Sequence, residues 1–155
     1  MSGSSGSPLN QAGSILPEVV TQVVAILRAH AGIIATLTDS EGRVKVWNNI
    51  PQGTVPPYLW VWSGEEDDVP QKLGAGHYGR TCTVIVYPVS RHRGTQEIDE
   101  LGSLVMQALE RQPLSLSAYR QAGIVWAPPT GRATMADVEG GPQITRELIF
   151  RATAR

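Results

Sequence analysis

The 155-residue chain has few of the residues that build redox, metal or catalytic sites. Its one cysteine, Cys82, excludes an internal disulfide, and its three histidines, His30, His77 and His92, are too far apart in the sequence for zinc-ligand spacing. Cys82 lies within a predicted strand, where a cysteine is more often a small buried residue than a nucleophile. We therefore expect no metal and no cofactor.

The chain also lacks an excess of charge of one sign and a long hydrophobic run. Thirteen basic and fourteen acidic side chains give a formal net charge of -1. That balance does not favour a sequence-reading nucleic-acid protein, because such proteins carry a basic face. No run approaches the roughly 18 to 20 consecutive apolar residues of a membrane span, and no apolar segment follows a basic N-terminus. We expect a protein with no membrane contact that folds inside the cell.

The length fits one domain, which we place at residues 15–155. Residues 1–14 are expected to form a flexible arm, and residues 1–7 within it resemble an expression-tag linker. The sequence contains no internal repeat that would divide the domain.

Hydrophobic periodicity predicts two helices and a small set of strands. Apolar residues from Leu16 to His30 recur at spacings of three and four, and Thr95 can cap a second helix that ends before Pro113. Residues 33–37 could continue the first helix or form a short buried segment. Strands are predicted at residues 43–47, from Tyr58 onward, and at residues 77–88, 123–126 and 143–153, with loops at residues 64–76 and 128–142. The predicted class is α+β, a mostly antiparallel sheet of about four to five strands with two α-helices packed on one face.

One predicted strand begins at Tyr58, because Pro56 and Pro57 cannot donate ladder hydrogen bonds. This strand is apolar on both faces. If the helices cover the opposite face, the aromatic face is too apolar for a solitary monomer and becomes a candidate subunit interface. With the strand at residues 77–88, this candidate interface consists of Tyr58, Trp60, Trp62, Ile85 and Tyr87. The reverse arrangement would expose Leu59, Val61, Val84 and Val86.

Charged residues cluster in the predicted loops. The acidic cluster, Glu65, Glu66, Asp67 and Asp68, lacks the spaced ligands and the glycine of a calcium loop. No nucleophile elbow and no zinc-binding histidine pair occurs in the sequence. We therefore expect no catalytic residue and interpret the charged loops as contacts for partner proteins. The candidate contact residues are Glu65, Glu66, Asp67, Asp68, Arg91, His92, Arg93 and Arg132.

Several of these segments together resemble one family. They are I-P-Q-G-T-V-P-P-Y-L-W-V at residues 50–61, T-C-T-V-I-V-Y followed by S-R-H-R-G-T at residues 81–95, the helix E-I-D-E-L-G-S-L-V-M-Q-A-L, and the closing T-R-E-L-I-F-R-A. From about Leu16 to Thr153, the chain resembles the tail-completion or tail-terminator proteins of long-tailed bacteriophages, which belong to the neck that connects head and tail.

The resemblance implies a structural virion protein and not an enzyme. Such proteins form a ring, commonly hexameric, at the head-proximal end of the tail. There the ring stops polymerisation of the tail-tube protein and joins the tail to the head-closure protein of the connector. The resemblance also implies assembly in the host cytoplasm, with DNA passing through the lumen without being read.

Three other hypotheses remain open. The chain could be a tail-tube or head-closure subunit of the same assembly. It could be a small ligand-binding module whose aromatic cleft uses Trp47, Trp60 and Trp62. The weakest hypothesis is a hydrolase that uses His77 or His92 with a carboxylate of the acidic cluster.

Overall fold

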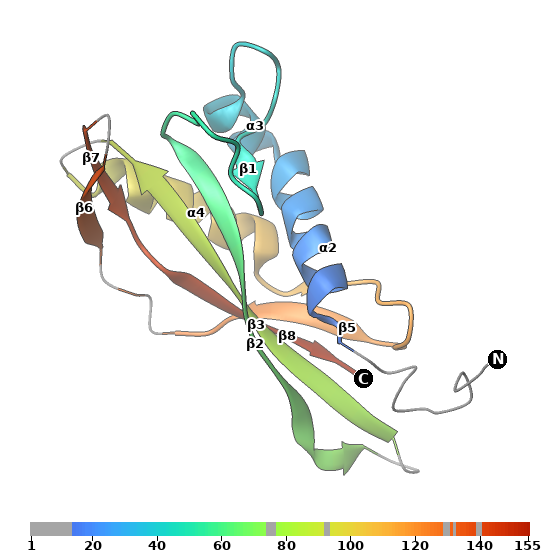
Figure 1. Cartoon of the computed structure of the whole chain (residues 1–155). Helices are drawn as coiled ribbons and strands as arrows, with labels where there is room; N and C mark the ends of the chain where they lie inside the picture. Colours follow the sequence, from blue (N-terminus) through green and yellow to red (C-terminus); the bar gives the residue numbers. More distant parts are fainter. Residues whose placement is uncertain (1–13, 74–76, 92–93, 129–130, 132, 139–140) are drawn as a thin grey trace.

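The computed structural model describes residues 14–155 except residues 74–76, 92–93, 129–130, 132 and 139–140, and for residues 67–73, 77–78 and 137–138 it describes the backbone alone. Within this part of the chain, three helices pack against a curled sheet of eight strands (Figure 1). The predicted α+β class is confirmed. The predicted numbers of strands and helices were too small, because short strands and one short helix gave no recognisable periodicity.

The helices form close to where apolar periodicity predicts them. Helix α2 spans Leu16–Ala29, α3 spans Ala31–Leu37 and α4 spans Gln96–Leu109. The undecided residues 33–37 therefore belong to a helix of their own. Thr95 does occupy the N-cap position of α4, but its side chain makes no capping hydrogen bond, so the predicted capping role was wrong.

The sheet is antiparallel except at one edge. Its strands follow the order β1-β2-β3-β8-β5-β4, with β7 paired to both β3 and β6. Among the strands of the described residues, β1 alone runs parallel to its neighbour, β2. The strands are β1 (Val46–Trp47), β2 (Tyr58–Leu73), β3 (His77–Ser90), β4 (Gln112–Pro113), β5 (Ala122–Trp126), β6 (Thr134–Val138), β7 (Gly141–Thr145) and β8 (Leu148–Ala154).

The two long loops predicted from the sequence were wrong. Most of residues 64–76 belongs to β2, which pairs with β3 as far as Leu73 and His77 and contains two register shifts that accommodate its irregular residues. Gly64 lies at the first shift, where a Cβ atom would be 2.2 Å from the Thr83 hydroxyl oxygen. Residues 128–142 likewise contain β6 and the start of β7. Pairing with a neighbouring strand outweighs the weak local strand propensity of both segments.

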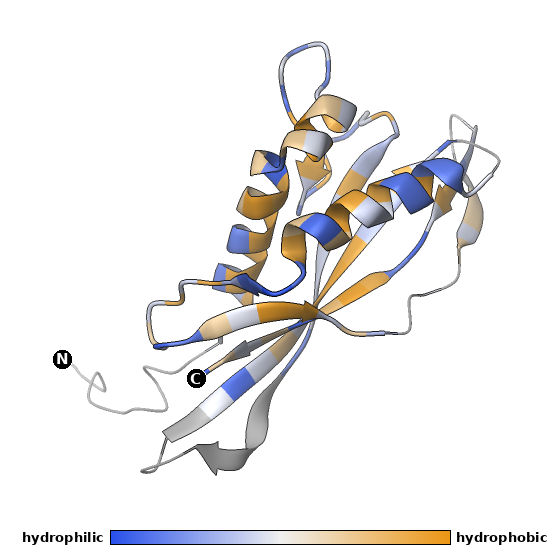
Figure 2. Cartoon of the chain, turned by 180° about the vertical axis from the view of Figure 1, so that it is seen from behind, coloured by the Kyte–Doolittle hydropathy of each residue, from blue (hydrophilic) through white to orange (hydrophobic). Residues whose placement is uncertain are grey.

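The hydrophobic core lies between the helices and one face of the sheet. Figure 2, which views the molecule from the side opposite to Figure 1, shows the two long helices, α2 and α4, lying across the sheet. Leu59 and Val61 of β2 and Val84 and Val86 of β3 are all 0% exposed and pack in the same cluster as residues of α2 and α4. Of the two arrangements left open by the sequence, the helices therefore cover the aliphatic face and leave the aromatic face uncovered.

The opposite faces of β8 allow a paired test of this core. Phe150 is 0% exposed, so Phe150→Ala should lower the free energy of unfolding by about 3 to 5 kcal/mol through lost burial and the cavity left behind. The adjacent Ile149 lies on the uncovered face, and Ile149→Ala should cost about 1 kcal/mol or less. Urea unfolding of both variants measures the difference, and equal losses would contradict the assignment of the two faces.

Candidate interface on the uncovered sheet face

The uncovered face of β2 and β3 carries a contiguous group of large side chains. We call Trp60, Trp62, Ile85 and Tyr87 the aromatic patch. The rings of Trp60 and Tyr87 stack with centroids 5.2 Å apart, and the Trp62 ring meets Trp60 edge-on at 5.1 Å. Trp62 is 47% exposed. The stacked rings are held in place, and they present an apolar surface that none of the three described helices covers.

The fifth residue of the predicted interface, Tyr58, differs from the other four. It lies at the start of β2, opposite Val89 of β3, and is only 8% exposed. Burial raises the pKa of its hydroxyl above the ordinary value of 10.0. Tyr58 therefore adds little accessible surface to the patch.

Strand pairing extends the uncovered apolar surface beyond the predicted residues. Ile85 of β3 lies opposite Ile149 of β8, and Arg151 of β8 lies opposite Val125 of β5. Val125 is 45% exposed. Sequence reasoning missed Val125 because its neighbours come from strands distant in the chain. The one local pattern that indicated this surface was the alternation in β8, where Ile149 and Arg151 face outward.

The hydroxyl of Tyr87 connects the aromatic patch to the segment before β8. It lies 3.3 Å from a carboxylate oxygen of Glu147, to which it donates a hydrogen bond. Burial, followed by the charge of Glu147 and this hydrogen bond, raises the pKa of Tyr87 above its ordinary value of 10.0. The hydroxyl thus stays protonated at neutral pH and serves as a donor that orients the ring.

The acidic cluster lies on β2 and not in a loop. Glu65 is exposed, and its backbone N–H donates to the hydroxyl of Thr83. The backbones of Asp67 and Asp68 pair with Thr81 and Arg80 of β3, while their side chains lie outside the described part of the chain. Of the side chains of the acidic cluster that the structure describes, that of Glu65 is the one exposed to solvent.

Glu66 fastens β2 to the start of α2. One carboxylate oxygen accepts hydrogen bonds from the backbone N–H groups of Ile15 and Leu16, both at 2.8 Å, and from the hydroxyl of Ser14. The other oxygen lies 2.6 Å from the guanidinium of Arg80. A carboxylate at a helix N-terminus satisfies backbone donors that have no partner within the helix. Burial alone would raise the pKa of Glu66, but the hydrogen bonds from Arg80, Ser14 and Leu16 lower it overall.

The basic candidates are only partly described. Arg91 is exposed directly after the end of β3. His92, Arg93 and Arg132 lie outside the described residues, so the structure does not bring them together with any other candidate.

The chemical alternatives gain no geometric support. Cys82 is 1% exposed, and burial, with a smaller effect from the charge of Glu66, raises the pKa of its thiol to about 12. Among the described residues, no three His, Cys, Asp or Glu side chains gather as metal ligands would. The side chain of His77 is outside the described part.

The described residues include no single helix that is long and apolar enough to span a membrane. Helices α2 and α3 reach that length and hydrophobicity only together, and they are bent by 78° where they join.

Trp47 of β1 is the register partner of Trp60 of β2, and its ring lies beside Arg28 of α2. Trp47 lies near the guanidinium groups of Arg28 and Arg43, whose carbons are 5.2 and 5.9 Å from its ring centroid. It lines a shallow hollow of about 450 Å³ between α2 and the segment that follows β1. Neither Trp60 nor Trp62 lines that hollow, because both belong to the aromatic patch on the uncovered face. That hollow is therefore not an aromatic cleft of all three tryptophans, and the ligand-binding hypothesis stays a prediction.

These features define a class of protein: an α+β domain that covers one sheet face with helices and leaves an apolar face uncovered, with no assembled catalytic group among the described residues. Comparison with known proteins places it more narrowly. The family model of the tail completion protein gp17 matches residues 21–133, most of the chain. The chain therefore belongs to the tail completion protein gp17 family, and it is a structural protein of bacteriophage tails.

Solved structures share the fold. A chain from the virion of a native gene transfer agent particle aligns with a TM-score of 0.66 at 22% identity, covering 92% of this chain and 98% of that one. A second solved structure aligns with a TM-score of 0.53 at 12% identity, covering 88% of this chain and 94% of that one. At these identities the similarity supports the fold alone. No curated protein matches the sequence.

The Glu66 contacts predict a defined pH dependence of stability. The pKa of Glu66 in the folded chain is below its ordinary value of 4.5, so its carboxylate stabilises the fold above that pH and stops doing so as the pH falls through the folded-state pKa. Glu66→Gln should therefore lower the free energy of unfolding at neutral pH, and its difference from wild type should shrink in acid. Urea unfolding at a series of pH values measures this.

The matched control is Glu65→Gln, because Glu65 is exposed and its carboxylate accepts no hydrogen bond among those of the described residues. Its stability should follow the wild-type pH dependence. A Glu66→Gln curve that runs parallel to wild type from neutral to acid pH would contradict the role given to this carboxylate.

Proposed function

We propose that this chain is a tail terminator, a non-enzymatic virion subunit that forms a ring at the head-proximal end of a phage tail. The ring, commonly hexameric, would stop polymerisation of the tail tube and join the tail to the head-closure protein of the connector. The observation that carries the proposal is an uncovered aromatic patch on a member of the tail completion family.

The aromatic patch has the properties of a subunit contact. An exposed tryptophan beside stacked aromatic rings buries much apolar area at little cost in conformational entropy, and such residues are enriched at the energetic centres of interfaces. Its 47% exposure makes Trp62 the most accessible ring of the patch. A ring requires contacts between different surfaces of neighbouring subunits, and this patch would supply one of the two.

The remaining partners would meet the ring through its charged edges. Glu65 is exposed on β2 and Arg91 directly after the end of β3, where the tail-tube protein and the connector could contact them. The net charge of -1 is consistent with a lumen through which DNA passes without sequence-specific binding. The particle that contains the first structural neighbour is a virion, which agrees with a virion component. The position in the tail or neck and the assembly in the host cytoplasm are part of the proposal, and membership of the tail completion family supports the tail position.

The interface role of Trp62 can be separated from folding. Trp62→Asp should weaken self-association at least tenfold, because it introduces a charge at the proposed contact, and should shift the melting temperature little, because the side chain is 47% exposed. The matched control is Val55→Asp, since Val55 is 52% exposed and lies outside the patch. Sedimentation velocity and thermal melting measure the two effects. Loss of folding in Trp62→Asp, or unchanged association, would count against the interface.

Terminator activity itself can be tested on tail tubes. Tubes assembled without this protein should acquire a ring at one end when it is added, and should then no longer lengthen when tube subunits are supplied. Electron microscopy measures ring occupancy and tube length. Continued growth of tubes that carry no ring would contradict the proposal, and growth of this protein alone into long tubes would identify a tube subunit instead.

A further inference from the structure

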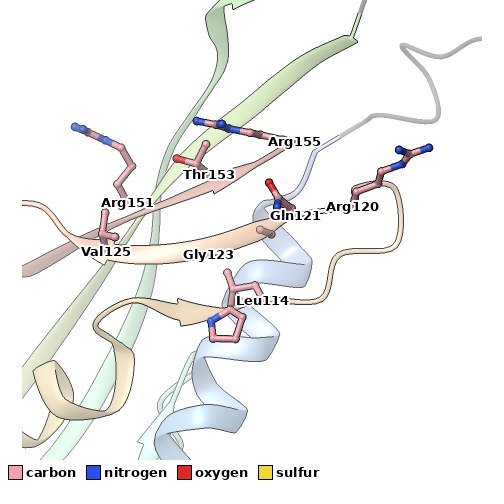
Figure 3. Close-up of a pocket in the computed structure, with 10 residues that line it drawn as sticks. Leu114, Arg120, Gln121, Gly123, Val125, Arg151, Thr153 and Arg155 are labelled. Atoms are coloured by element: carbon pink, nitrogen blue, oxygen red, sulfur yellow. The ribbon is translucent and has the colours of Figure 1, made fainter. Parts of the chain in front are cut away.

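A second surface on the uncovered face is rich in arginine. A hollow of about 570 Å³ lies where β4, β5 and β8 meet, on the other side of β3 from β2 (Figure 3). Gly123 of β5 and Thr153 of β8 are register partners within it. Gly123 has no side chain, which leaves space between its neighbours. We call this surface the arginine hollow, after the residues Arg120, Arg151 and Arg155 that line it.

The three arginines of this hollow have no acidic partner among the described residues. Among the hydrogen bonds and ion pairs of the described residues, none involves a guanidinium group of Arg120, Arg151 or Arg155. By contrast, Arg80 and Arg146 each contact a carboxylate. Three cations on one surface repel one another, and a carboxylate ligand would relieve that repulsion through charge-assisted hydrogen bonds. The arginine hollow thus fits an acidic ligand.

The ligand must also be partly apolar. Val125 lines the same hollow beside Arg151 and is 45% exposed. Covering Val125 requires an apolar side chain, whereas the arginines require carboxylates. A nucleic-acid backbone would satisfy the arginines but would leave Val125 uncovered, so a protein segment suits both requirements better.

The chain itself carries a surface with this combination. On β2, the exposed Trp62 is followed within a few residues by Glu65, the first of four consecutive acidic residues. The hollow spans β8 and β5, which lie two and three strands from β2 in the sheet. With a twist of roughly 20 to 25° between adjacent strands, these two to three steps turn the face by roughly 40 to 75°. The two surfaces therefore face different directions, as a head-to-tail contact requires.

We infer that the arginine hollow of one subunit receives the β2 side of the next copy of the chain. In this contact Glu65 lies against the arginines of the hollow, and Val125 packs near Trp62. The inference rests on the proposed ring and names the second surface that the ring requires. The same two surfaces repeat at every contact, as a head-to-tail ring requires.

Charge reversal on each side tests the pairing. The β2 variant replaces Glu65 and its acidic sequence neighbours Asp67 and Asp68 by lysine. It keeps Glu66, which binds the start of α2. The hollow variant replaces Arg120, Arg151 and Arg155 by glutamate. Each variant alone places like charges at every contact, so ring formation should fall at least tenfold. An equimolar mixture of the two variants should recover ring formation. The lysines of the β2 variant fit the glutamates of the hollow variant, and the unchanged surfaces of the two variants pair as in the wild type.

Mass photometry in solution and electron microscopy of tail-tube ends measure ring formation, and thermal melting confirms that each variant folds. Arg91→Glu is the matched control, because Arg91 is exposed and lies outside the hollow, and it should form rings as wild type does. A folded pair of variants whose mixture fails to recover would overturn the contact.

Two further outcomes separate this inference from the proposed function. Rings formed by either variant alone would overturn the contact and leave the terminator proposal standing. Wild-type protein that forms no ring in solution or on tubes would overturn both. If the hollow variant loses affinity for a short DNA duplex but assembles normally, the hollow binds phosphate and not a second copy.

Discussion

The β2–β3 hairpin is apolar on both faces, and the helices cover only one of them. Leu59 and Val61 on β2 pack under α2 and α4, while Trp60 and Trp62 point the other way. Successive residues of a strand alternate between faces, so a slip of one residue would place the aromatic side chains under the helices. The pairing of Trp60 with Tyr87 and of Val61 with Val86 fixes the register. The core and the uncovered apolar surface both depend on this one alignment.

The acidic stretch of β2 serves two purposes that the sequence does not separate. Glu66 accepts hydrogen bonds from the start of α2 and contacts Arg80, so it holds the hairpin against the first helix. Its neighbour Glu65 is exposed and remains available to a partner. One carboxylate thus stabilises the subunit while the adjacent one is free for assembly, and only the fold distinguishes them.

Local patterns predicted what depends on local order. The helix at Leu16–Ala29, the start of β2 at Tyr58 and the division of its residues between two faces follow from periodicity and from the prolines before it. The extension of β2 to Leu73 does not, since that segment is polar and becomes a strand only by pairing with β3 through two register shifts. The arginine hollow combines segments around residues 113–125 and 151–155, and no local pattern indicates that they meet. The interface residues of the aromatic patch remain a prediction.

The proposed ring requires neighbouring copies to meet through the uncovered sheet face. The most direct measurement is a cryo-electron microscopy map of the protein on the end of a tail tube, at a resolution that shows tryptophan side chains. We expect a closed ring in which Trp62 of each copy is buried against the next copy while α2 and α4 stay outside that contact. A ring whose copies meet through α2 and α4, with Trp62 exposed to solvent, would contradict it.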